Sequence, residues 1–158
     1  AVQKNSTGAN FDPSRTVPSA PLVVINIAER PARALIDTGS LCDFISSSLA
    51  DQLELKRTEL VTPLVVQLAV QGSRSRVNYR VTTTFAYQGI NENRDFDVIN
   101  LSNYDVILGT PFLYQYSAAV GLNPTRVIIG STTSLPIEGH EVKTLQSRAA
   151  QLEDNYFE

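Results

Sequence analysis

The segment that most constrains this chain is residues 34–40, which read ALIDTGS and place an acidic residue directly after an apolar run. The apolar run predicts a buried strand, and Asp37, Thr38 and Gly39 favour a sharp turn at its end. This order presents a carboxylate in a cleft. A carboxylate that performs acid–base chemistry on a peptide bond needs a second carboxylate beside it. Because the motif occurs once, the second would come from another copy of the chain.

The composition is that of one folded domain with little excess charge. Of the 158 residues, 42% are hydrophobic, and 13 basic and 16 acidic residues give a net charge of −3. There is no basic tract, which argues against nucleic-acid binding, and the apolar runs are far shorter than the ~18–20 residues of a membrane span. The single Cys42 excludes an internal disulfide and fits a reducing, intracellular compartment. The chain contains no Met, so we expect it to be part of a longer polypeptide.

Short runs of β-branched and apolar residues between turn signals predict a mainly β domain. Residues 29–31 and 88–89 are expected to form turns, and residues 62–63 are expected to end the segment before the third strand. The predicted strands comprise residues 22–27, 32–36, 64–70, 76–87, 95–99, 106–108, 119–122 and 126–129.

Two short helices are expected between these strands. The first would be capped by Ser46 or Ser47 and would place apolar residues at helical spacing within 49–55. The second would be capped by Thr110, with Pro111 at its first position, where a missing N–H is tolerated.

Changes in composition along the sequence divide the chain into three regions. Residues 1–20 are rich in Ser, Asn, Pro and Gly and predict a flexible lead-in. Residues 21–131 hold every predicted strand and form the expected domain. Residues 132–158 predict a linker and a marginal C-terminal helix, because apolar residues recur only weakly at helical spacing within 139–157.

Three segments together resemble the retropepsins, the single-domain aspartic proteases of retroviruses and long-terminal-repeat retrotransposons. They are residues 35–40, the glycine-bearing hairpin near Gly72, and residues 104–113, which read YDVILGTPFL. A helix before the hairpin makes the chain most similar to gypsy-type retrotransposon proteases and related eukaryotic domains. The resemblance covers residues 21–131 and implies the closed β-barrel of the acid proteases, with one catalytic motif per chain.

The resemblance implies a role for each residue of the acidic motif. Asp37 resembles the catalytic Asp, and Thr38 resembles the residue whose hydroxyl bonds across the dimer to the other active-site loop. Gly39 resembles the residue whose backbone lets the substrate approach closely. Ser40 stands where the family tolerates Ala or Ser.

The hairpin and the later segment also receive implied roles. Residues 70–75 resemble the flap, although a tip with a single glycine, Gly72, near Arg74 and Arg76 departs from the family pattern. Residues 126–129 are the candidate strand for dimer contact. The implied flap and substrate-binding residues are Val70, Gln71, Gly72 and Ser73, and the implied structural residues near the site are Ile107, Leu108 and Gly109.

Other chemically capable residues receive plainer interpretations. Asp43 and Asp105 are expected to be solvated or to cap a backbone N–H. Cys42 is expected to be a small buried side chain rather than a nucleophile, because no His lies nearby in the sequence to activate it. His140 is expected on the surface. Without a His/Cys cluster we expect no metal site, and no cofactor is implied.

The resemblance implies an aspartic endopeptidase that acts as a homodimer on an extended peptide, with retroelement Gag-Pol processing as its task. It implies a location in the cytoplasm or in virus-like particles. Three alternatives stay open. The Asp37 motif can be a simple strand-ending turn. The fold can serve as a catalytically decayed module for dimerisation or peptide binding. A eukaryotic protease of ubiquitin-linked proteins would need an attached ubiquitin-like domain, which these 158 residues do not contain.

Overall fold

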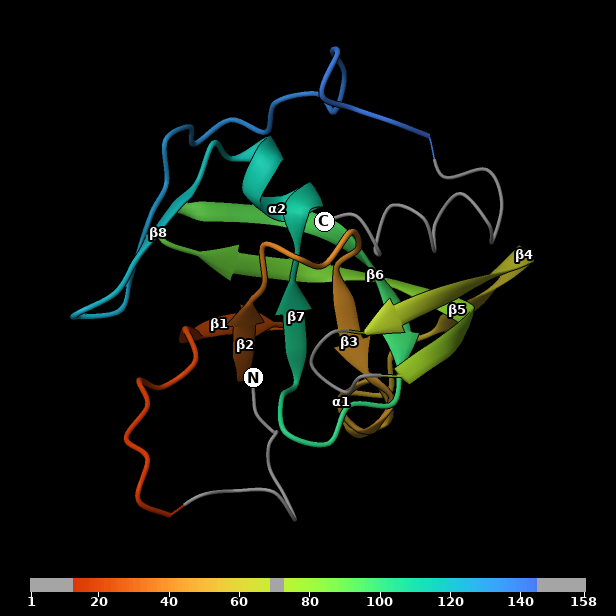
Figure 1. The fold of residues 1–158 in the computed structure, drawn as a ribbon. Helices are drawn as coiled ribbons and strands as arrows, with labels where there is room; N and C mark the ends of the chain where they lie inside the picture. Colours follow the sequence, from red (N-terminus) through yellow and green to blue (C-terminus); the bar gives the residue numbers. More distant parts are fainter. Residues whose placement is uncertain (1–12, 69–72, 145–158) are drawn as a thin grey trace.

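The computed structural model describes residues 13–68 and 73–144, and its central feature is a closed β-barrel (Figure 1). Six strands form a ring, which pairing between β1 and β5 closes. The strand β4 (Arg57–Leu68) adds to β5 outside this ring. The expectation of a mainly β, closed-barrel fold is therefore confirmed. In ring order the strands are β1 (Leu22–Ile27), β2 (Arg30–Ile36), β7 (Val106–Leu108), β3 (Phe44–Ser46), β6 (Ile90–Ile99) and β5 (Ser73–Tyr87).

Strands β2 and β7 run parallel at the centre of the structure, and this pairing positions the acidic loop (Figure 1). Leu35 pairs with Ile107, and Ile36 pairs with Leu108. Both strands are apolar and buried where they pair, as expected for parallel strands covered on both faces. Because the two strands end side by side, the residues that follow them, Asp37 and Gly109, leave the sheet at the same edge.

The turn between β1 and β2 falls earlier than the predicted residues 29–31. Ala28 and Glu29 form it with φ of 51° and 65°, and Arg30 already pairs with Ile27. Positive φ at both central residues matches the right-handed twist of the flanking strands, so this turn closes a tight hairpin. Pro31 is tolerated in β2 because the pairing of β2 with β7 begins only at Ala34.

The predicted turn at residues 88–89 is present between β5 and β6. Strand β6, however, begins at Ile90 rather than at the predicted residue 95. Its first half is mostly polar, and Ile90, which is buried, is the one apolar residue there that a sequence pattern could use. The long pairing with β5, from Tyr87 opposite Ile90 onward, gives these polar residues their extended form.

Residues 62–63 do not end the preceding segment as predicted. Strand β4 starts at Arg57 and passes through them, and its register with β5 shifts between Glu59 and Leu64. The shift is a bulge, which leaves the residues between these two positions outside the regular ladder. Pro63 therefore has no ladder hydrogen bond to donate, and the strand continues past it.

Two short helices are present, and the structure decides how each one begins. Ser46 caps α1 (Ser47–Gln52), since its Oγ accepts the Leu49 N–H at 3.0 Å. The N-cap of α2 (Thr110–Gln115) is Gly109 and not Thr110 as predicted. The reason is tertiary, because residues distant in the sequence accept the N–H groups at the start of this helix. The Gly109 N–H donates to Asp43 Oδ1, and the Thr110 N–H donates to the Ser40 carbonyl.

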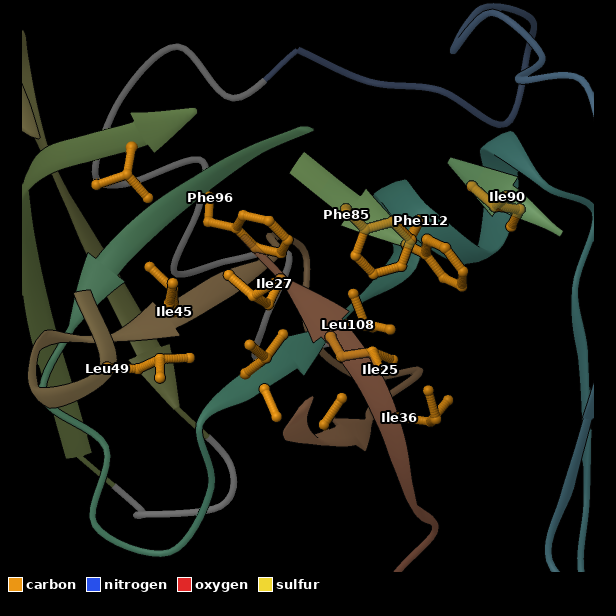
Figure 2. Packing of buried hydrophobic residues seen from close by; sticks show 14 of the residues in the cluster. Ile25, Ile27, Ile36, Ile45, Leu49, Phe85, Ile90, Phe96, Leu108 and Phe112 are labelled. Carbon is orange, nitrogen blue, oxygen red and sulfur yellow. The ribbon is translucent and has the colours of Figure 1, made fainter. Parts of the chain in front are cut away.

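The main core fills the barrel with side chains from nearly every strand and from α2. Figure 2 shows Phe85 between Phe96 and Phe112 within this core. The rings of Phe85 and Phe112 meet edge to face with centroids 5.5 Å apart, a favourable aromatic geometry. A second buried cluster lies beside β4 and β5, and its members are Leu35, Phe44, Val66, Val77, Ile99, Leu101 and Ile107.

The chain continues beyond the barrel into a small hairpin and a segment that follows α2. Strands β8 (Ala119–Gly121) and β9 (Arg126–Ile128) pair with each other, each one residue shorter than predicted. The Leu135 N–H donates to the Gln115 carbonyl at 2.7 Å, so this segment lies against the end of α2. Residues 140–141 form a turn and residues 142–144 are not helical, while the rest of the predicted helix, residues 145–157, lies outside the described chain. No helix in the described ranges is long and apolar enough to cross a membrane.

Candidate active site

The Asp37 loop leaves the end of β2 and is held in shape by its own backbone. The Asp37 N–H donates to the Leu108 carbonyl at 3.0 Å, which continues the pairing of β2 with β7 by one residue. Oδ1 of Asp37 accepts the Gly39 N–H at 2.9 Å, and the Asp37 carbonyl accepts the Ser40 N–H at 3.1 Å. Asp37 is partly exposed, and Thr38 and Gly39 are exposed. The loop therefore presents an oriented, partly exposed carboxylate.

Gly109 supports the loop from behind, and no other residue fits there. A Cβ on Gly109 would lie 2.5 Å from the Ser40 carbonyl oxygen and 2.4 Å from that of Cys42. The Thr110 N–H donates to the same Ser40 carbonyl at 2.8 Å, and Ser40 Oγ donates to the Cys42 carbonyl at 2.7 Å. The structure thus brings the predicted residues 37–40 and 107–109 into one unit.

Asp43 is buried rather than solvated, which corrects one of the two interpretations offered for it. Its Oδ1 accepts the Gly109 N–H at 2.8 Å, so the second interpretation, a capping role, describes it. Its Oδ2 lies 2.6 Å from Arg94 Nη2, and the side chains of Asp43 and Arg94 are 5% and 6% exposed. Burial raises the pKa of the Asp43 carboxyl, and the charge of Arg94 opposes that rise.

Sequence reasoning did not single out Arg94. One signal for Arg94 is the alternation of buried and exposed side chains along β6. Arg94 shares a face of the strand with Phe96 and Val98, which are both buried. A cation at an inward position needs a buried anion, and Asp43 supplies it. Asp105, the other acid with a capping interpretation, accepts the Arg33 N–H on its Oδ2 at 2.9 Å.

Burial, with acidic groups adding to its effect, keeps the Cys42 thiol protonated. Burial, together with the charges of Asp97 and Asp43, raises the pKa of Cys42 to about 12. A thiol in this state is a poor nucleophile. Burial also raises the pKa of Asp97, whose Oδ1 has no hydrogen-bond partner within the described part of the chain. Arg80 Nε lies 3.9 Å from that oxygen.

Tyr104, which precedes β7, is a site neighbour that sequence reasoning left without a role. It packs partly buried against the second cluster. Burial raises its pKa, the charge of Arg33 opposes the rise, and the charge of Asp37 adds to it.

The predicted flap residues fall in the sequence where β4 ends and β5 begins. Val70, Gln71 and Gly72 are outside the described residues. Ser73 begins β5 and pairs with Leu68, so the two strands lead into and out of the predicted tip. The structure thus describes both strands that would carry a flap, whereas the tip itself stays a prediction.

The described residues provide no metal site. No group of three His, Cys, Asp or Glu side chains gathers anywhere in ranges 13–68 and 73–144. His140 is exposed in the segment that follows α2.

The closed barrel, with an acidic loop exposed at the end of β2, is the fold of a retropepsin-like protease domain. Residues 33–135 match the PEG10/RTL1 protease domain, and the chain belongs to this family. A family of this kind supports a function of the aspartic-protease type. No match was found among curated proteins.

Two solved structures show the same fold at low sequence identity. The retroviral protease-like domain of Ddi1 from Leishmania major is 20% identical, with a TM-score of 0.55 over 76% of this chain and 97% of that domain. The EIAV protease, solved with the inhibitor HBY-793, is 17% identical, with a TM-score of 0.54 over 69% of this chain and 99% of that protein.

Proposed function

We propose that this chain is an aspartic endopeptidase that works as a homodimer, with one Asp37 from each copy in the active pair. The observation that carries the proposal is the presentation of Asp37. Its carboxylate stands on a partly exposed loop, oriented by the Gly39 N–H at 2.9 Å, in a chain that holds the motif once. The retropepsin-like fold and the family membership support it.

The chemistry follows from two carboxylates placed side by side. Like charges in contact cannot both ionise comfortably, so the pair holds one proton between them. The ionised member takes a proton from a water molecule, which attacks the scissile carbonyl. The protonated member polarises that carbonyl and then supplies a proton to the leaving nitrogen. Thr38, next to Asp37, would bond across the two-fold axis and keep the two loops in register.

The β8–β9 hairpin is the surface that we assign to the dimer contact. Among the described residues, its strands pair only with each other, so backbone edges are open to a second chain. Ile128 and Leu122 expose apolar side chains, at 56% and 50%. Gln88 Nε2 donates to the Val127 carbonyl at 3.0 Å, which fixes β9 against the barrel.

The substrate would be an extended peptide that lies between the paired acids and the β4–β5 hairpin. Its backbone would add to the sheet as a further strand, and residues 70–73 would close over it and exclude water. We assign the activity to the processing of a retroelement polyprotein, in the cytoplasm or within virus-like particles. This assignment rests on the family to which the chain belongs.

The deciding experiment compares Asp37→Asn with the unchanged chain in a peptide-cleavage assay. The variant keeps the shape of the side chain but cannot share a proton as an acid, so cleavage should disappear while the fold persists. Asp51→Asn, which removes an exposed carboxylate on α1 that pairs with Arg57, outside the proposed site, is the matched control. A statine-type mimic should inhibit, because its hydroxyl would sit between the paired acids. Binding of peptide without turnover at any pH would favour a decayed binding module instead.

A further inference from the structure

Backbone groups of the active-site loop and the side chain of Asp43 hydrogen-bond this part of the chain to the end of β7 and the start of α2. Two of these bonds join backbone groups only. In a third bond the Asp43 carboxylate accepts the Gly109 N–H. In chain order of the donors, these three bonds are Asp37 N to Leu108 O at 3.0 Å, Gly109 N to Asp43 Oδ1 at 2.8 Å, and Thr110 N to Ser40 O at 2.8 Å.

Arg94 holds the Asp43 carboxylate in this position from β6. Its Nη2 and Nε lie 2.6 Å and 3.2 Å from Oδ2 of Asp43, and its Nη1 lies 3.0 Å from Glu92. The guanidinium also lies over the ring of Phe112, 5.3 Å from its centroid. One cation thus connects the end of the active-site loop, strand β6 and helix α2.

Stability alone does not account for this arrangement. Two charges that are almost completely buried lose their hydration, and apolar residues of similar volume often stabilise a fold as well or better. What an ion pair adds is a defined geometry, since only one arrangement satisfies all its hydrogen bonds. The geometry it defines is that of the Gly109 turn, which lies so close to Ser40 that a Cβ on Gly109 would be 2.5 Å from the Ser40 carbonyl oxygen.

We infer that Asp43 and Arg94 are positioning residues for the proposed reaction. Asp43 fixes the Gly109 turn, the turn fixes the Ser40 carbonyl, and the loop then holds Asp37 where its partner copy can share a proton. The inference rests on the proposed function, because it concerns the alignment of two carboxylates. Displacements of about 1 Å near reacting groups lower rates by about 100-fold, so this alignment matters for kcat.

The test uses two double variants that differ only in the hydrogen-bond acceptor at residue 43. Both carry Arg94→Met, which removes the buried cation. Asp43→Asn keeps an oxygen that can accept the Gly109 N–H, whereas Asp43→Leu has a similar shape without an acceptor. Because Arg94 also holds Asp43, we expect both variants to lose kcat relative to the unchanged chain. The Leu/Met variant should have a kcat about tenfold or more below that of the Asn/Met variant, with KM little changed, at a temperature where both are fully folded.

Equal kcat in the two variants would overturn the inference, as would a loss that merely follows the fraction of folded protein. If the leucine variant does not fold, Asp43→Ala with Arg94→Met provides the same comparison. A merely structural role would lower the melting temperature and leave the kcat of the folded enzyme in place.

Amide hydrogen exchange separates this inference from the proposed function. The N–H groups of Asp37 and Thr110 should exchange about tenfold faster or more in the Leu/Met variant than in the Asn/Met variant, when compared at equal global stability. Unchanged protection of both amides would contradict the positioning role. If the unchanged chain cleaves no peptide, the proposed function fails, while the exchange rates still decide whether Asp43 orders the loop.

Discussion

Gly109 lies so close to Ser40 that a Cβ atom on it would be 2.5 Å from the Ser40 carbonyl oxygen. The neighbour is backbone and cannot rotate away, and the Cys42 carbonyl closes the other side at 2.4 Å. The apolar pair followed by glycine at the end of β7 thus has a steric cause. It lets the start of α2 approach the loop that carries Asp37.

Gly109→Ala should destabilise the protein by about 1–3 kcal/mol, the usual range for overpacking, and should remove cleavage. Gly39→Ala is the matched control for stability, because a Cβ there would meet its nearest neighbour, Asp37 Oδ1, at an ordinary 3.4 Å. Urea unfolding of both variants measures the difference. Equal stability of the two would show that the Gly109 turn can yield.

Asp97→Asn should stabilise the protein at neutral pH by about 1 kcal/mol, the scale of one poorly satisfied buried polar group. Burial raises the pKa of Asp97 in the folded state. The folded chain therefore binds the proton more tightly than the unfolded chain does. The stability that this gives is complete below the unfolded pKa of about 3.9 and is lost as the pH rises through the folded pKa.

The advantage of Asp97→Asn should accordingly shrink as the pH falls from 7 towards 3. Thermal unfolding across this range measures it, with the exposed Asp51→Asn variant in parallel to report the effect of removing a surface charge. An advantage that stays constant with pH would contradict the burial argument for Asp97.

Cys42 should resist alkylation in the folded protein. With its pKa raised to about 12, almost no thiolate is present at pH 8. Iodoacetamide labelling followed by mass spectrometry should be at least tenfold slower than in the urea-unfolded chain. Cys42→Ala should keep cleavage, since the thiol has no part in the proposed mechanism; a loss of activity at full stability would assign it one.

Ile128→Lys should weaken dimerisation without unfolding the barrel, because Ile128 is 56% exposed on β9. A charge there disfavours the pairing of two such edges. Analytical ultracentrifugation should show a higher dimer dissociation constant, and lost activity should return at higher protein concentration. Val61→Lys, at a fully exposed position of β4, is the control and should change neither property. Unaltered self-association of Ile128→Lys would place the dimer contact elsewhere.

Local sequence patterns were enough wherever a residue's neighbours in the chain decide its structure. The apolar run before Asp37 and the later run 106–108 predicted β2 and β7 correctly, and Ser46 caps its helix as one of two candidates. The polar start of β6 at Ile90 was missed, because its extended form comes from pairing with β5. The passage of β4 through Pro63 was missed for a similar reason, since a bulge removes the usual conflict with proline.

The sequence by itself determined that one acidic turn follows a buried strand, since an apolar run and turn-forming residues act over a few positions. It also determined that a single chain carries half of the proposed pair. Only the tertiary structure decided that Gly109 caps α2, that Asp43 is buried, and that Arg94 neutralises it. These are contacts between residues more than 50 positions apart, as with Asp43 and Arg94, and a linear pattern does not record which distant partner satisfies a buried polar group.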